Sequence, residues 1–99
     1  IGSGPAYVFY FAESLIKAAE GLEISDEDKR TLIERLFEGS LKLSKNSKES
    51  LSALRDQVTS PGGVTQEAIM YMQEKEIFQN IVSAIEAGEK KAKKLGEEK

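Results

Sequence analysis

The sequence contains neither cysteine nor histidine in its 99 residues. Without cysteine, no disulfide and no thiolate metal site can form within the chain. Without histidine, Ser-His-Asp and Cys-His catalysis are excluded, and metal binding loses its commonest ligand. We therefore expect no metal site. The lack of cysteine also fits a cytoplasmic location, because disulfides belong to oxidising compartments.

Excess positive charge and long apolar runs are also missing. The formal net charge of −3 argues against nucleic acid or an anionic membrane as a partner. No apolar run approaches the roughly 20 residues that a membrane span requires. The N-terminus lacks the layout of a signal peptide. Because the first residue is Ile1 rather than methionine, we expect the chain to begin within a longer protein.

Hydrophobic residues recur at helical spacing along the chain, and no stretch has the alternation of a strand. The pattern predicts an all-α domain over residues 1–99 with about five helices. We expect them over residues 6–19, 26–45, 47–58, 65–72 and 77–95. The predicted N-caps are Ser3, Ser25 (in a capping box with Asp28), Ser47 and Thr65, and the predicted helix stops are Asn46 and Gly96.

The first predicted helix carries more apolar surface than one small core can cover. Its apolar arc spans roughly 180°, against about 100° for an ordinary surface helix. Leaving Phe9, Phe11, Leu15 and Ile16 exposed would forgo about 1.5–3 kcal/mol each. A domain has a total stability of only about 5–15 kcal/mol, so we expect a second subunit to cover this helix.

Two short runs could be taken for ligand sites. Residues 2–7 begin like a dinucleotide-binding glycine fingerprint, but no strand precedes them and Tyr7 replaces the third glycine. Residues 26–28 are acidic and could suggest a metal site, but acidic residues also favour the positive end of a helix dipole. We interpret both runs as helix starts.

Residues 60–65, Ser-Pro-Gly-Gly-Val-Thr, form the only turn-rich stretch, and we call them the glycine turn. Two glycines leave backbone N–H groups accessible to a ligand. The helix that follows begins with N–H groups that lack partners and attract anions. The turn can therefore bind a carboxylate or phosphate, or it can simply reverse the chain between two helices. Composition alone favours neither interpretation.

Two segments carry a family resemblance. Residues 54–65, LRDQVTSPGGVT, resemble the signature segment of pyrroline-5-carboxylate reductases nearly residue for residue, and residues 2–7, GSGPAY, resemble the start of that family's C-terminal domain. The resemblance implies a fold like the C-terminal domain of 6-phosphogluconate dehydrogenase, assembled as an intertwined homodimer. Larger rings of dimers also occur in the family.

The resemblance also implies a reaction, the reduction of 1-pyrroline-5-carboxylate to L-proline by NADPH or NADH in proline biosynthesis. It implies that the coenzyme sits on an N-terminal Rossmann domain that this chain lacks, so the fragment should bind no coenzyme and be inactive alone. It assigns the substrate carboxylate to the Ser60 hydroxyl and the amides around Gly62, Gly63 and Val64, and the ring nitrogen to the catalytic Thr65 hydroxyl.

The chain departs from the family pattern at two places. Lys48 and Glu49 stand where the family often has an acidic residue near the coenzyme, and Lys75 and Glu76 replace a glycine-containing turn. Two alternative functions remain. One is a non-catalytic helical interaction module in which the glycine turn is purely structural. The other is the helical domain of a related NAD(P)-dependent dehydrogenase.

Overall fold

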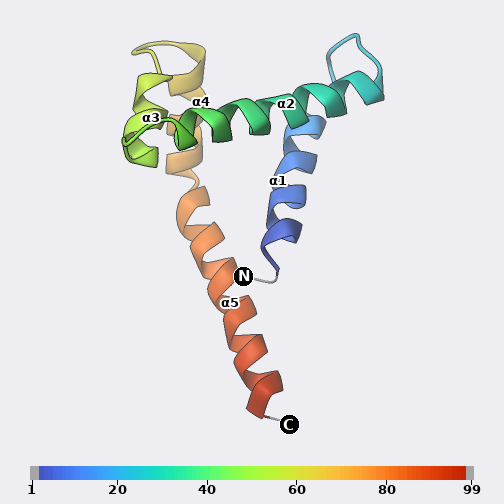
Figure 1. Cartoon of the computed structure of the whole chain (residues 1–99), viewed down its shortest axis with the longest axis vertical. Coiled ribbons are helices and arrows are strands. Elements are labelled where there is room, and N and C mark those ends of the chain that lie inside the picture. The colour runs from blue at the N-terminus through green and yellow to red at the C-terminus, as the bar shows by residue number, and fades with distance from the viewer. Residues whose placement is uncertain (1–2, 98–99) are drawn as a thin grey trace. The chain divides into compact units, whose positions relative to one another are not determined.

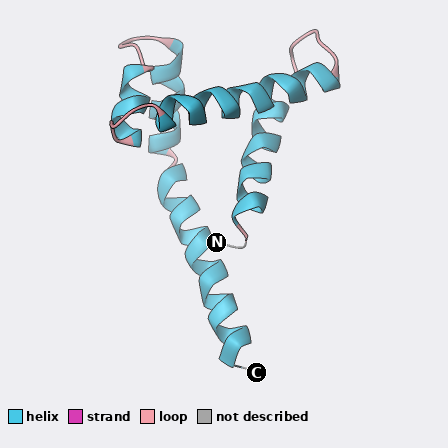
Figure 2. Cartoon of the chain, in the orientation of Figure 1, coloured by secondary structure: helices cyan, strands magenta, loops and turns pink. Residues whose placement is uncertain are grey.

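A computed structural model describes residues 3–97, which form five α-helices and no strand (Figure 1, Figure 2). The helices are α1 (Gly4–Ala18), α2 (Asp26–Lys45), α3 (Leu51–Gln57), α4 (Val64–Glu74) and α5 (Ile77–Glu97). The prediction of an all-α chain with five helices is confirmed. The chain divides after Leu51 into an N-terminal unit, with α1 and α2, and a C-terminal unit, with α4, α5 and nearly all of α3. No helix in the described part is long and apolar enough to cross a membrane.

Helix α2 begins after the N-cap predicted from the sequence, Ser25. The Ser25 hydroxyl accepts a hydrogen bond from the Asp28 N–H at 3.1 Å, with Ser25 in the extended conformation that capping requires. Three acidic residues, at positions 26–28, occupy the first turn, and Lys42 and Lys45 occupy the last. Both groups complement the helix dipole, so the local sequence alone accounts for both ends of α2.

The other predicted N-caps were wrong. Ser3 precedes α1, but its backbone is helical and its side chain makes no capping bond. The Ser47 hydroxyl accepts from the Glu49 N–H at 3.0 Å, four residues before the start of α3. Thr65 lies inside α4, because Gly63 already has the extended backbone of an N-cap. Glycine is an acceptable N-cap residue, so α4 begins at Val64, earlier than the predicted cap at Thr65 implied.

Of the two predicted helix stops, Asn46 is confirmed as the residue at which α2 ends, though without the left-handed conformation, and Gly96 is wrong. Asn46 has φ −92° and ψ 9°, so α2 ends without a left-handed residue, and its last carbonyls accept from the Asn46 and Ser47 N–H groups. Gly96 lies within α5. A glycine costs a helix only about 1 kcal/mol, which does not end a helix of this length. Gly2, the first residue of the predicted helix-start run, lies outside the described residues.

In the N-terminal unit, α1 lies against the N-terminal half of α2 (Figure 1). Phe11 of α1 and Phe37 of α2 pack edge to face, with ring centroids 6.2 Å apart and planes at 89°. Lys29 is buried near the start of α2, and its Nζ donates to the Glu20 carbonyl at 3.4 Å and lies 3.7 Å from the Asp26 carboxylate. Lys29 therefore links Glu20, two residues after the end of α1, to the first turn of α2.

Apolar side chains remain exposed in both units. Among the described residues, no hydrophobic side chain is buried. Phe9 on α1 is 66% exposed and Phe78 on α5 is 76% exposed. This agrees with the expectation that α1 has more apolar surface than a single chain covers.

The junction between α4 and α5 keeps a left-handed residue without a glycine. Glu76 has φ 54°, a conformation that costs a residue with a Cβ roughly 1–2 kcal/mol. The Lys75 N–H donates to the Tyr71 carbonyl at 3.0 Å, and the Glu76 carbonyl accepts the Asn80 N–H at 2.9 Å. These bonds hold Glu76 in place where glycine would be free of strain.

Replacing Lys29 with alanine should lower the free energy of unfolding by about 1–2 kcal/mol, because the Glu20 carbonyl loses its charged donor. Urea unfolding followed by circular dichroism measures the change. Arg35→Ala, at an exposed position on the same helix, is the matched control and should stay within about 0.5 kcal/mol of the wild type. Equal effects of the two changes would contradict a specific role for Lys29.

Glu76→Gly should raise the free energy of unfolding by about 1 kcal/mol, because glycine adopts positive φ without strain. Thermal unfolding of the two proteins tests this. The control, Glu86→Gly in the interior of α5, should lower stability by about 1 kcal/mol. A loss of stability in both variants would show that the backbone at Glu76 is not strained.

Candidate functional site

The glycine turn follows directly on the end of α3. The Val58 and Thr59 N–H groups donate to the carbonyls of Arg55 and Asp56 at 3.3 and 3.1 Å. The Thr59 hydroxyl donates to the Arg55 carbonyl at 2.6 Å. These bonds satisfy backbone carbonyls at the end of α3 and fix the backbone of the two residues that precede the glycine turn.

Both glycines are required by the shape of the turn. Gly62 has φ +75°, a left-handed conformation that side chains with a Cβ disfavour. A Cβ on Gly63 would lie 3.2 Å from the Ser60 carbonyl oxygen, which is a tight contact. The Gly63 N–H donates to the same oxygen at 3.0 Å. The glycines therefore allow the chain to close on Ser60 before α4 begins.

Two of the amides predicted to bind substrate already donate to protein groups. The Gly63 N–H bonds to Ser60, and the Gly62 N–H donates to the Gln66 side-chain oxygen at 2.7 Å. The N–H groups of Val64, Thr65 and Gln66 lie in the first turn of α4, where no helix carbonyl can accept them, and Gly63 supplies no side-chain cap. These three N–H groups are the open donors of the site.

The two predicted hydroxyls stand close to these donors in the sequence. Ser60 and Thr65 are exposed, and neither hydroxyl is hydrogen-bonded to any group of residues 3–97. The Val64 side chain is 89% exposed. Three open N–H groups at the positive end of a helix, with two free hydroxyls beside them, can bind a carboxylate.

Gln66 belongs to this site, and the sequence analysis missed it. A glutamine three residues after an N-cap is the capping-box pattern, in which its side chain reaches back to the backbone before the helix. That signal is present once Gly63 is taken as the N-cap. The expectation that Thr65 capped α4 concealed it.

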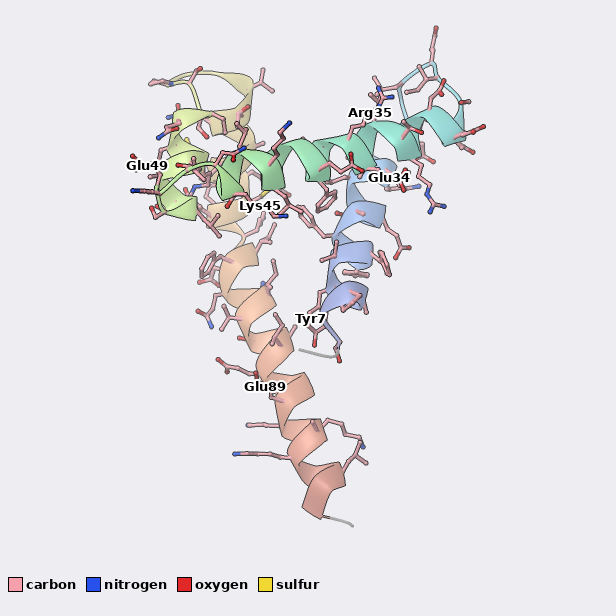
Figure 3. The ribbon with its side chains drawn as sticks, in the orientation of Figure 1. Tyr7, Glu34, Arg35, Lys45, Glu49 and Glu89 are labelled. Atoms are coloured by element: carbon pink, nitrogen blue, oxygen red, sulfur yellow. The ribbon has the colours of Figure 1, made fainter. Side chains whose placement is uncertain are left out.

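The described part of the glycine fingerprint, residues 3–7, is a helix start: Gly4 is already helical in α1, and a proline stands in its first turn. Lys48 and Glu49 are exposed between α2 and α3, where Figure 3 labels Glu49. No cluster of three or more metal-ligating side chains occurs among residues 3–97.

A second feature is an apolar groove between α1 and α2, with a volume of about 520 Å³, which we call the α1–α2 groove. Its rim is charged, and Glu34 of the rim lies on the stretch of α2 that crosses α1 (Figure 3). The apolar lining consists of Val8, Phe9, Ala12, Ile16, Ile33 and Phe37, and the charged lining of Glu13, Arg30, Glu34 and Glu38. An apolar floor with a charged rim is typical of a protein interface.

These features define an all-helical domain that combines an uncovered apolar groove with a helix N-terminus open to an anion. The family model described as pyrroline-5-carboxylate reductase dimerisation matches residues 1–95. The chain therefore belongs to the pyrroline-5-carboxylate reductase family and corresponds to its dimerisation domain.

Individual relatives agree with this assignment. The chain is 32% identical over 99 residues to the pyrroline-5-carboxylate reductase of Kluyveromyces lactis, covering 100% of this chain and 35% of that protein. It is 38% identical over 94 residues to the Aquifex aeolicus reductase, covering 95% and 36%. The crystal structure of Plasmodium falciparum pyrroline carboxylate reductase with NADP bound matches 87% of this chain and 35% of that one, with a TM-score of 0.81 and 34% identity. The chain thus spans about a third of the length of these relatives.

Proposed function

We propose that this chain is the substrate-binding and dimer-forming domain of a cytoplasmic pyrroline-5-carboxylate reductase. The complete enzyme reduces 1-pyrroline-5-carboxylate to L-proline with NADPH or NADH. Its coenzyme is held by a Rossmann domain that precedes Ile1. Membership of the family supports this proposal, and so does the fact that the chain spans only about a third of the length of its relatives.

The open N-terminus of α4 is the observation that carries the substrate assignment. The Val64, Thr65 and Gln66 N–H groups bind the substrate carboxylate, and the Ser60 hydroxyl donates to it from the turn. The helix dipole adds to this attraction, because the carboxylate lies at its positive end. Compared with the sequence-based assignment, the Val64 amide is kept, and the Thr65 and Gln66 amides replace those of Gly62 and Gly63, which already donate to protein groups.

Thr65 acts on the other end of the substrate. Its exposed hydroxyl hydrogen-bonds the ring nitrogen and holds the C=N bond in a fixed orientation. The coenzyme supplies a hydride to the imine carbon, and the protonated nitrogen takes up the electron pair of the C=N bond. Because the imine arrives protonated and the hydride comes from the coenzyme, no histidine is needed.

A second copy of the chain fills the α1–α2 groove. Phe9 lines this groove and is 66% exposed, and in the described part of one chain no hydrophobic side chain is buried. Burying several such side chains against a partner contributes about 1.5–3 kcal/mol each. Folding of the chain and formation of the dimer therefore depend on each other. The dimers can also associate into larger assemblies.

In the complete reductase, Thr65→Ala should lower kcat/KM roughly tenfold to a hundredfold, because the ring nitrogen loses a hydrogen bond worth about 1–3 kcal/mol. Steady-state kinetics with 1-pyrroline-5-carboxylate measure this loss. Thr31→Ala is the control, since the Thr31 hydroxyl bonds the Glu27 carbonyl within α2. Wild-type kinetics in Thr65→Ala would remove Thr65 from the mechanism and leave the glycine turn as a structural corner.

Phe9→Glu should convert the dimer to monomer or unfold it, because it places a charge in the α1–α2 groove. Analytical ultracentrifugation with circular dichroism distinguishes these results and also detects larger assemblies. The control is Tyr10→Glu: Tyr10 is the next residue on α1 and is 79% exposed, but it does not line the groove. A stable Phe9→Glu dimer would place the subunit contact elsewhere.

A further inference from the structure

Gln66 makes the side-chain contact that links α4 to the glycine turn. Its Oε1 atom accepts the Gly62 N–H at 2.7 Å, and the side chain is half-buried. The bond spans four residues and runs from the first turn of the helix back to the residue at φ +75°. One side chain thus holds the left-handed residue of the turn against the start of α4.

The turn needs such a restraint because of its composition. Glycine has the largest backbone freedom of any residue, and here two glycines stand in sequence. The Gly63–Ser60 bond closes one side of the turn, and the Gly62–Gln66 bond closes the other. Without the second bond, Gly62 can leave its left-handed conformation, and Ser60 is no longer held beside the open donors of α4.

Gln66 also keeps the Gly62 N–H from competing for the substrate. A free amide in the turn would offer the carboxylate a second position, away from the Val64 and Thr65 donors. A site that is ordered before binding loses less entropy when the ligand arrives. Affinity for the carboxylate therefore depends on the bond between Gln66 and Gly62.

We infer that Gln66 is a positioning residue for the substrate carboxylate, acting through Gly62. Its side-chain oxygen holds the glycine turn in the conformation that presents the Ser60 hydroxyl and the first N–H groups of α4 to one anion. This inference rests on the proposed function, since it presumes that the substrate carboxylate binds at α4.

The test compares Gln66→Met and Gln66→Glu in the complete reductase. Methionine keeps the length and helix propensity of glutamine but loses the acceptor oxygen, whereas glutamate keeps an acceptor. Gln66→Met should raise the KM for 1-pyrroline-5-carboxylate roughly tenfold with kcat within about twofold, the size expected for one lost hydrogen bond. Gln66→Glu keeps the acceptor but adds a negative charge beside the bound carboxylate, so its KM should also rise. Added salt should lower that KM towards the wild-type value, whereas the KM of Gln66→Met should not respond to salt. Gln73→Met, at an exposed position on the same helix, is the control and should match the wild type.

Hydrogen–deuterium exchange of the segment containing residues 60–66 provides an independent readout. Exchange there should be faster in Gln66→Met and normal in Gln66→Glu, because only the former frees the Gly62 N–H. An unchanged KM in Gln66→Met overturns the inference, and so does a fall in kcat at constant KM. Exchange of residues 60–66 that is as fast in Gln66→Glu as in Gln66→Met also overturns it.

Thr65→Ala in the same assay separates this inference from the proposed function. If Thr65→Ala is impaired while Gln66→Met behaves as the wild type, only the role of Gln66 is wrong. If Thr65→Ala and Gln66→Met are both normal, the substrate does not bind at α4, and the substrate site in the proposed function is wrong.

Discussion

Burial of apolar surface is the constraint on which this domain depends. In residues 3–97 no hydrophobic side chain is buried, and aromatic residues as large as Phe9 and Phe78 remain mostly exposed. The contacts within one chain are few and local, such as the edge-to-face pair of Phe11 and Phe37. Burial is the largest favourable contribution to folding, so a chain that leaves its apolar faces open folds stably only when something covers them. The family model that matches residues 1–95 is described as a dimerisation domain, in agreement with this physical requirement.

The candidate substrate site depends on a more local balance, between flexibility and restraint in the glycine turn. Gly62 allows a left-handed turn, and Gly63 allows close approach to the Ser60 carbonyl. The same two glycines would leave the turn loose, and the side chain of Gln66 opposes this by binding the Gly62 N–H. The result is a helix start whose first N–H groups lack protein partners while the turn beside them is held in place. The glycine turn therefore reverses the chain between α3 and α4 and also shapes the proposed anion site at the start of α4.

Much of the fold could be predicted, because helix periodicity is a local property of the sequence. Ser25 and Asp28 cap α2 as expected, since all the atoms of that cap lie within four residues. The other caps failed because a hydroxyl residue near a helix start caps only if its backbone is extended. Ser3 is helical, and Gly63 takes the position expected for Thr65. At the candidate site the sequence located the turn, its hydroxyls and the helix that follows, but it could not show which amides were already bonded.

The sequence by itself determined the all-helical architecture, the excess of apolar surface on α1 and the resemblance that the family match confirmed. These properties follow from periodicity and from the identity of short segments, so they need no knowledge of three-dimensional contacts. Only the tertiary structure decided that Gln66 binds Gly62, that Lys29 links the end of α1 to α2, and that Glu76 takes a left-handed conformation. Each of these contacts depends on the path of the backbone in a loop between two helices. That path is set by several hydrogen bonds together, so no single residue predicts it.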